Sequence, residues 1–288
     1  MKKIVFHISL LLAVSIFTSC EIINPPEQVP SYIYIDSFIL HGRYDSVGSL
    51  SNYITDAWVI VDNEFIGTYE LPALIPVLKN GNAKLIIKAG IKENGIAYTR
   101  LPYPFYNYII QNRNFIPKQI DTLTPSVYYL EHGYKMPIYE DFEDANFLFT
   151  KTERSNIGLE STDINEQVFE GEYSQIARLT KAGDLFEIES TSFYQLPRGK
   201  AIFLELNFKT NILLSVGYIA ESTTSTYQHT VLNLNPTDNW KKIYINFGNE
   251  IDFESTQYVF KIFVGALKST SGDTAVVQMD NIKLLYLE

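Results

Sequence analysis

The 288-residue sequence contains a single cysteine, so no disulfide can form within the chain and no zinc site can be built from several cysteines. Histidine is also scarce, and His41, His132 and His229 are isolated in settings more typical of surface or turn residues than of a catalytic base. No metalloprotease, serine-hydrolase, dinucleotide-binding or phosphate-loop motif occurs. The sequence therefore predicts a protein that is not an enzyme.

Charge is sparse as well, at 19% of residues, and acidic residues outnumber basic ones by 33 to 23. A net charge of −10 with no basic block argues against nucleic acid as a partner. In contrast, 46% of the residues are hydrophobic and 14% are aromatic, which is enough apolar material for a packed core. The length corresponds to about two domains.

The N-terminus has the composition of a targeting segment. Lys2 and Lys3 precede an apolar run, Ile4–Phe17, which is too short for a stable membrane-spanning helix of about 20 residues. The run ends in Phe17-Thr18-Ser19-Cys20, which resembles the lipobox of bacterial lipoproteins, of the kind found in Bacteroidota, although an aliphatic residue is more usual than Phe17. The resemblance implies a signal peptide over residues 1–19 and acylation of Cys20. The alternative is an ordinary signal peptide with Cys20 as a free thiol.

Lipidation of Cys20 would hold the protein at a membrane through its acyl chains. For a lipoprotein of this kind, we expect anchoring at the outer membrane, with the chain in the periplasm or on the cell surface. No later segment reaches about 18 uninterrupted apolar residues, so no transmembrane helix is predicted. Residues 20–30 are rich in proline and are predicted to form an extended tether.

Residues 31–134 are predicted to form a β-sandwich. Short runs of β-branched and aromatic residues, such as Tyr32–Leu40, alternate with turn signals, and Ala57–Val61 and Phe65–Tyr69 are expected to form a hairpin. The segment from Trp58 to Gly95 resembles PEGA-type and related Ig-like modules of bacterial surface proteins. The matching positions are Trp58, Val61, Asp62, Ile66, Gly67, Leu71, Pro72 and Gly81. The resemblance implies an Ig-like fold and a spacer or interaction role.

An aromatic and proline-rich strip, Leu101–Tyr108, leaves two interpretations open. It could be an exposed partner-binding strip, because aromatic residues are enriched at binding hot spots. The favoured alternative is that it packs between sheets or between the two domains.

Residues 135–288 contain further strand-like runs without a long helix, which fits a two-sheet jelly roll. The runs are Leu185–Ile188, Ala201–Phe208, Leu213–Tyr218, Tyr227–Leu234, Trp240–Phe247, Tyr258–Leu267 and Ala275–Tyr286. The sequence thus predicts an all-β chain with an N-terminal Ig-like sandwich and a C-terminal jelly roll.

Four short motifs of this region occur in an order that resembles galactose-binding-like jelly rolls, including many carbohydrate-binding modules. They are an opening Asp141–Asp144 strand, a Gly171–Ser174 turn, a Trp240–Ile245 strand and a final Asp280–Leu284 strand. The resemblance implies that the first and last strands lie side by side, often with a structural Ca²⁺ at their end. Glu143, Asp280 and carbonyls of the turn would be its ligands, since calcium prefers carboxylate and carbonyl oxygens. The alternative is a solvated acidic strand end.

Such modules bind sugars on exposed aromatic side chains. Trp240 is the obvious candidate, although a Trp in this motif more often caps the core, and nothing singles out one of the 20 tyrosines as a ligand-binding residue.

We therefore expect a non-enzymatic, membrane-anchored lipoprotein whose jelly roll binds a glycan or a protein partner at the cell envelope. The first alternative is a structural subunit of a secretion, adhesion or motility assembly without sugar binding. The second is a glycan-active hydrolase, although the closest approach to a carboxylate motif, Ser161–Glu166, has its first acid one residue out of register.

Overall fold

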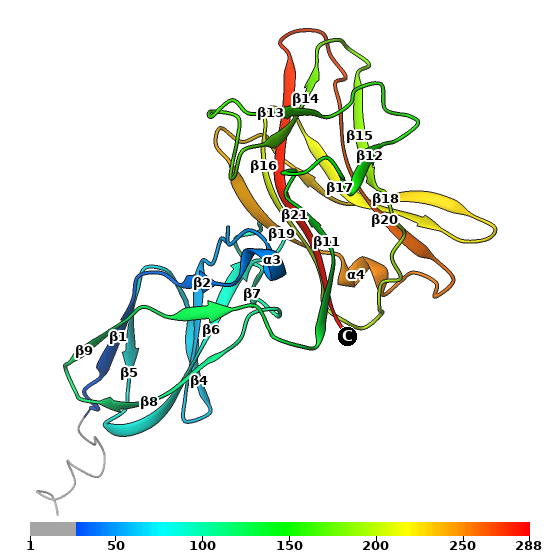
Figure 1. Cartoon of the computed structure of the whole chain (residues 1–288). Coiled ribbons are helices and arrows are strands. Elements are labelled where there is room, and N and C mark those ends of the chain that lie inside the picture. Colours follow the sequence, from blue (N-terminus) through cyan, green and yellow to red (C-terminus); the bar gives the residue numbers. More distant parts are fainter. Residues whose placement is uncertain (1–26) are drawn as a thin grey trace, which may run out of the picture.

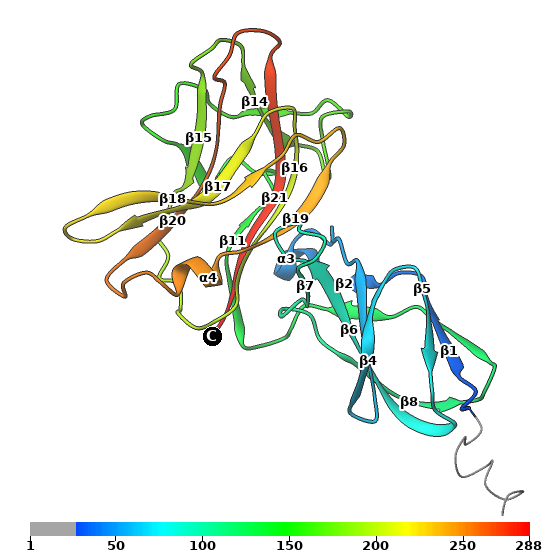
Figure 2. The same cartoon turned by 180° about the vertical axis from the view of Figure 1, so that it is seen from behind.

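The computed structural model describes residues 27–288, which form two β-sandwiches joined along one side (Figures 1 and 2). The predicted signal peptide, Cys20 and most of the predicted tether lie outside these residues. The all-β prediction is confirmed, because the only helices among residues 27–288 are four residues long. None of the helices in this part of the chain has the length and apolar character needed to cross a membrane.

The N-terminal sandwich consists of short strands and one helical turn. Its elements are β1 (Ser31–Ile35), β2 (Ile39–His41), α3 (Tyr44–Val47), β3 (Asp56–Val61), β4 (Glu64–Glu70), β5 (Ala73–Val77), β6 (Gly81–Lys92), β7 (Arg100–Pro102), β8 (Ile109–Phe115), β9 (Ile120–Leu123) and β10 (Ser126–Tyr128). One sheet has the order β4-β3-β6-β7, with β8 also paired to β6, and the other has the order β5-β1-β9. Strands β2 and β10 form a separate parallel pair. The Ig-like character of this part stays a prediction.

The expected hairpin is present as β3 and β4, with Val61 paired to Glu64. Asp62 and Asn63 form its two-residue turn in the left-handed region, at φ 49° and 69°. This turn matches the right-handed twist of paired strands, which explains why Asp-Asn follows the apolar run.

Two details of this part differ from the predictions. The run Tyr32–Leu40 is divided into β1 and β2 by an irregular segment, and the sequence Ile96–Thr99, whose composition also favours a strand, forms turns. The middle of the strip Leu101–Tyr108 packs inside, as the favoured interpretation held, because Tyr103, Phe105 and Tyr106 are buried, whereas Tyr108 at its end is 50% exposed.

The C-terminal part is a two-sheet sandwich, as predicted for a jelly roll. Its elements are β11 (Tyr134–Glu140), β12 (Phe149–Lys151), β13 (Glu160–Thr162), β14 (Ser174–Leu179), β15 (Leu185–Ser190), β16 (Ile202–Thr210), β17 (Leu214–Glu221), β18 (Thr226–Leu234), β19 (Lys241–Asn246), α4 (Gly248–Ile251), β20 (Val259–Leu267) and β21 (Ala275–Leu287). One sheet has the order β13-β14-β21-β16-β19, with β11 also on β21, and the other has the order β12-β15-β20-β17-β18. The first and last strands, β11 and β21, are antiparallel neighbours, as expected.

The expected Asp141–Asp144 strand is wrong in detail, because β11 ends at Glu140. The Glu140 carboxylate accepts hydrogen bonds from the backbone N–H groups of Phe142, at 2.9 Å, and Leu148. Phe142 itself has a positive φ of 60°. The acidic segment therefore forms a tight turn after the strand.

The two sandwiches share a buried junction. Phe203 of β16, Tyr244 of β19 and Leu285 of β21 pack into the core cluster of the N-terminal sandwich. The backbone N–H of Asn94 donates to the Tyr244 carbonyl at 2.9 Å, so the turn after β6 extends the edge of β19. Both views show β19 on the side of its sandwich that faces the N-terminal part (Figures 1 and 2).

Candidate functional site

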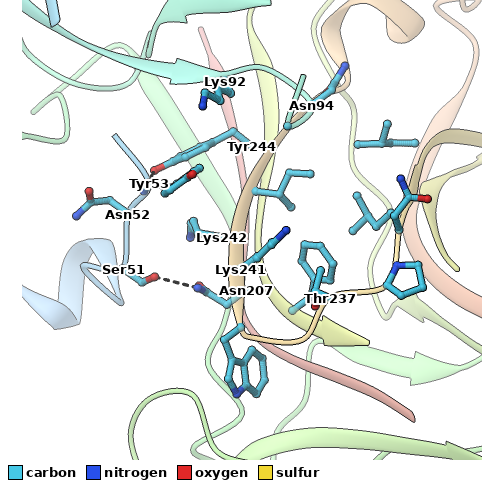
Figure 3. Close-up of a pocket in the computed structure, with 18 of the residues that line it drawn as sticks. Ser51, Asn52, Tyr53, Lys92, Asn94, Asn207, Thr237, Lys241, Lys242 and Tyr244 are labelled. Atoms are coloured by element: carbon cyan, nitrogen blue, oxygen red, sulfur yellow. Dashed lines mark hydrogen bonds between the residues drawn. The ribbon is translucent and has the colours of Figure 1, made fainter. Parts of the chain in front are cut away.

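A groove of about 560 Å³ lies where the two sandwiches meet (Figure 3). The N-terminal sandwich supplies one wall through two loops and the end of β6. The C-terminal sandwich supplies the other through β16, β18, β19 and the segment before β19. The lining side chains are mainly amides, aromatic rings and lysines. They include Ser51, Tyr53, Lys92, Asn94, Phe169, Asn207, Asn233, Asn235, Thr237, Trp240, Lys241, Lys242 and Tyr244.

On the C-terminal wall, Trp240 lines the groove just before β19. Its ring centroid lies 5.3 Å from that of Phe169, and it is partly buried. Its Nε1 is buried and has no hydrogen-bond partner among the described residues. Trp240 therefore packs on a neighbouring ring, as a core cap would, while one side of it borders the groove.

On the N-terminal wall, the loop before β3 places Tyr53 at the groove with 53% of its surface exposed. Its backbone N–H donates to the Tyr244 hydroxyl at 3.0 Å, which fixes the loop against β19. Sequence reasoning missed Tyr53, because it lies in a loop of the domain that was expected to be a spacer. The only available signal was its place in a polar loop, and several other tyrosines share that feature.

Asn207 connects the two walls of the groove through its side chain. Its side chain is fully buried, and its Nδ2 donates to Ser51 Oγ at 2.9 Å (Figure 3). Its Oδ1 has no partner within residues 27–288, although buried amide oxygens are usually hydrogen-bonded. Asn235 and Thr237 border the same groove on the segment before β19.

A buried charged network lies directly behind the groove. Glu205 is fully buried and accepts hydrogen bonds from the Tyr103 hydroxyl at 2.7 Å and the Tyr129 hydroxyl at 3.0 Å. Lys242 Nζ lies 2.8 Å from Glu205 Oε2, at an angle that is not that of a hydrogen bond. Burial alone would raise the pKa of Glu205, but the ammonium groups of Lys242 and Lys283 hold it below its usual value.

Lys283 is the second cation of this network and is also fully buried. Its Nζ donates to the Ser49 carbonyl oxygen at 2.6 Å and to the Tyr129 hydroxyl at 3.4 Å. Burial lowers the pKa of Lys283 to about 8, against the opposing effect of Glu205. Because Ser49 and Tyr129 belong to the N-terminal sandwich, Lys283 links the two halves directly.

The two residues predicted to bind calcium lie on either side of the Gly171–Ser174 turn. Glu143 accepts hydrogen bonds from the backbone N–H groups of Glu172, at 3.0 Å, and Tyr173, at 3.1 Å. Asp280 accepts one from Ser174 Oγ at 2.6 Å. Burial, with a smaller contribution from Glu143, raises the pKa of Asp280 to about 7. The structure thus brings both residues to one turn.

Within residues 27–288, no three His, Cys, Asp or Glu side chains gather as a metal-binding group. The calcium ion therefore stays a prediction. The histidines with ring contacts lie apart from one another. His41 stacks on Tyr128 in the N-terminal sandwich, whereas His229 stacks on Tyr218 in the C-terminal one.

No family model matches the sequence, and no curated protein matches it. Among solved structures, a structure titled for carbohydrate-binding modules of the β-sandwich superfamily is 14% identical, with a TM-score of 0.42, and the match covers 91% of this chain and all of that one. The CBM22-1–GH10 modules of Clostridium thermocellum xylanase 10B, with xylohexaose, are 10% identical at a TM-score of 0.39. That match covers 52% of this chain and 28% of theirs.

A third match, the TmCBM61 module with β-1,4-galactotriose, is 14% identical at a TM-score of 0.30, covering 49% of this chain and 87% of that one. Likenesses this distant carry no functional argument.

Proposed function

We propose that this protein is a non-enzymatic, glycan-binding lipoprotein of the cell envelope, and that the groove between its two sandwiches holds the sugar. One observation carries the proposal: aromatic and amide side chains from both sandwiches converge on one groove of about 560 Å³. This volume lies in the range of about 300–1,000 Å³ that is common for small-ligand sites.

The side chains of the groove have the chemistry that sugars require. Tyr53 and Trp240 offer ring surface on which the apolar face of a pyranose can stack. The asparagines, such as Asn233 and Asn235, carry both donors and acceptors, which suit the paired hydroxyls of a sugar ring. The exposed fraction of Tyr53, 53%, leaves its ring available to a ligand.

The absence of catalysis is part of the proposal. Among the described residues that line the groove there is no Asp, Glu or His. Glycoside hydrolysis normally needs two carboxylates beside the scissile bond. The nearest buried carboxylate, that of Glu205, is bonded to Tyr103 and Tyr129 and has no exposed surface.

The membrane anchor is proposed from the lipobox-like Phe17–Cys20 sequence. The described chain begins at the end of the N-terminal sandwich that lies away from the C-terminal one (Figures 1 and 2). The groove lies at the other end of the N-terminal sandwich, where the two sandwiches meet. A Cys20→Ala variant is expected to be released from membranes on fractionation, and a variant that stays in the lipid fraction contradicts the anchor.

The glycan proposal is tested with the chain lacking residues 1–20 on a glycan array, followed by calorimetry with the glycans that bind. We expect Tyr53→Ala and Trp240→Ala each to lower the affinity about tenfold, since a lost stacking contact costs on the order of 1.5 kcal/mol. Phe253→Ala is the matched control, because Phe253 is 89% exposed and lies outside the groove.

Absence of binding to every glycan contradicts the proposal. Equal losses of affinity in Phe253→Ala and Tyr53→Ala contradict the location of the site.

A further inference from the structure

The charge of the groove is opposite to that of the protein. The chain has a net charge of −10, yet three of the side chains that line the groove are lysines and none is acidic. Lys241 and Lys242 come from β19, and Lys92 comes from the end of β6 on the other wall (Figure 3). Among residues 27–288, the acidic side chains therefore lie outside the lining of this groove.

Lys241 is the one of the three that is available to a ligand. It is exposed at the start of β19, and it has no ion-pair partner among residues 27–288. By contrast, Lys92 Nζ lies 2.9 Å from Glu70 Oε1, and Lys242 Nζ lies 2.8 Å from Glu205 Oε2. A ligand anion at Lys241 would not have to displace a carboxylate of the protein.

A buried charged network lies behind this wall. Glu205 is the carboxylate shared by Lys242 and Lys283, and the carboxylate of Glu170 also acts on Lys283. These buried charges oppose one another, whereas Lys241 adds an unpaired positive charge at the groove itself. A cleft with low-dielectric walls of one sign focuses its field on a bound ligand.

We infer that the groove selects an anionic glycan, one that carries carboxylate or sulfate groups, with Lys241 as the direct contact to the anion. This inference rests on the proposed glycan-binding function and specifies its ligand class. Asparagines and aromatic rings would hold the sugar rings, while Lys241 favours the charged substituent. A lysine ammonium binds either anion as a point charge, so the geometry favours neither carboxylate nor sulfate.

The experiment uses two pairs of polysaccharides that differ only in charge. Polygalacturonic acid is compared with its carboxyl-reduced product, and dextran sulfate is compared with dextran, by calorimetry on the chain lacking residues 1–20. We expect at least one charged member to bind ten times more tightly than its neutral partner. Its affinity should fall as NaCl is raised from about 50 to 500 mM, because salt screens the attraction.

Lys241→Gln should lower the affinity for the charged polymer about tenfold, the size of one hydrogen bond to a charged group, and should lower it more than the affinity for the neutral polymer. Lys241→Glu should lower it further. Lys151→Gln is the matched control, because Lys151 is exposed on β12 and does not line the groove.

The outcomes separate this inference from the proposed function. Equal binding of neutral and charged members, still dependent on Tyr53 and Trp240, overturns the anionic preference and leaves the glycan site in place. Equal losses in Lys151→Gln and Lys241→Gln also overturn it, because the attraction would then not belong to the groove. Absence of binding to all polysaccharides of the array and of these pairs overturns both proposals.

Discussion

The two faces of the sheet that contains β16, β19 and β21 are both buried, but they are built differently. On β16, Ile202, Leu204 and Leu206 point into the C-terminal sandwich and join its apolar core. The alternate residues Phe203 and Glu205 point to the other side and are just as buried, at 2% and 0% exposure. The inner face is a conventional hydrophobic core, whereas the outer face holds charges and tyrosine hydroxyls.

The inner face stabilises the C-terminal sandwich itself, whereas the outer face joins it to the N-terminal sandwich. The inner face stabilises the fold by removing apolar area from water. Such a core tolerates the replacement of one hydrophobic side chain by another of similar volume. The outer face depends on directional contacts, because Glu205, Lys242 and Lys283 each need a partner once they are buried. Such contacts are satisfied in one relative orientation of the two sandwiches, and that orientation forms the groove.

The largest expected effect is that of Glu205→Gln. The substitution removes the carboxylate that the buried Lys242 and Lys283 share, and breaking a buried ion pair in this way typically costs about 3–5 kcal/mol. We expect the free energy of unfolding, measured in urea, to fall by this amount. We also expect the single unfolding transition to separate into two, as the sandwiches lose their connection.

The matched control is Glu64→Gln, since Glu64 is exposed at the start of β4. It should leave the unfolding curve unchanged within about 0.5 kcal/mol. A Glu205→Gln protein as stable as the control would mean that the network contributes nothing to joining the sandwiches.

A second carboxylate on the outer side, that of Asp280, tests the role of the lysines. Asp280 is as buried as Glu205, at 1% exposure, but its direct partners are neutral groups, and its pKa is raised to about 7 instead of lowered. A group that binds a proton on folding stabilises the protein at low pH and loses that contribution as the pH rises. We therefore expect the contribution of Asp280 to stability to decline between about pH 4 and pH 7.

The measurement is the free energy of unfolding across this pH range for the wild type and for Asp280→Asn, with the contribution of Asp280 changing by at most about 1.4 kcal/mol per pH unit. The variant should lose this component of the pH dependence.

If calcium binds at Glu143 and Asp280, millimolar Ca²⁺ should raise the wild-type melting temperature at pH 8, and EDTA should reverse the rise. Indifference to both would remove the calcium prediction, and an unchanged pH profile in the variant would contradict the raised pKa.

The next largest loss of stability is expected from a substitution at a glycine of the junction, Gly48. Gly48 has a φ of 67°, and a Cβ there would lie 2.0 Å from Cε2 of Tyr139 on β11. Gly48→Ala would combine backbone strain with a collision between the two sandwiches, so we expect a loss of about 2–3 kcal/mol in thermal or urea unfolding. Gly133→Ala is the control for strain alone, because its φ is 83° and no atom lies within 4 Å of a Cβ there. Equal losses in both variants would show that the contact with Tyr139 is unimportant.

The strands of both sandwiches could be predicted because their residues follow local rules. β20, for example, is within one residue of the expected run Tyr258–Leu267, since apolar residues and flanking turns define it. The outer face could not be predicted in this way. Glu205, Lys242 and Lys283 occupy alternate positions that would face solvent in a lone sandwich, and only the second sandwich buries them.

The candidate site was harder still to predict. Trp240 could be named because it opens the Trp240–Ile245 motif, but Tyr53 and Asn207 become neighbours of the groove only through the docking of a loop onto β19. That docking depends on residues more than 150 positions apart, for which one sequence offers no pairing signal. Tertiary contact therefore determines the groove, whereas local pattern determines the strands around it.

The smallest expected loss of stability comes from removing single tyrosine hydroxyls at the junction. Comparing two such variants distinguishes the contribution of the Glu205 charge from that of ring packing. Tyr103→Phe keeps the ring beside Phe203 but removes the hydroxyl that donates to Glu205 at 2.7 Å. Loss of a hydrogen bond to a charged group should cost about 1.5 kcal/mol in urea unfolding. Tyr106→Phe should cost about 0.5 kcal/mol, because that hydroxyl contacts only the neutral Tyr244 hydroxyl, at 3.4 Å. Equal costs in the two variants would mean that the outer face is held by ring packing, like the inner one, and that the charge of Glu205 adds nothing to the junction.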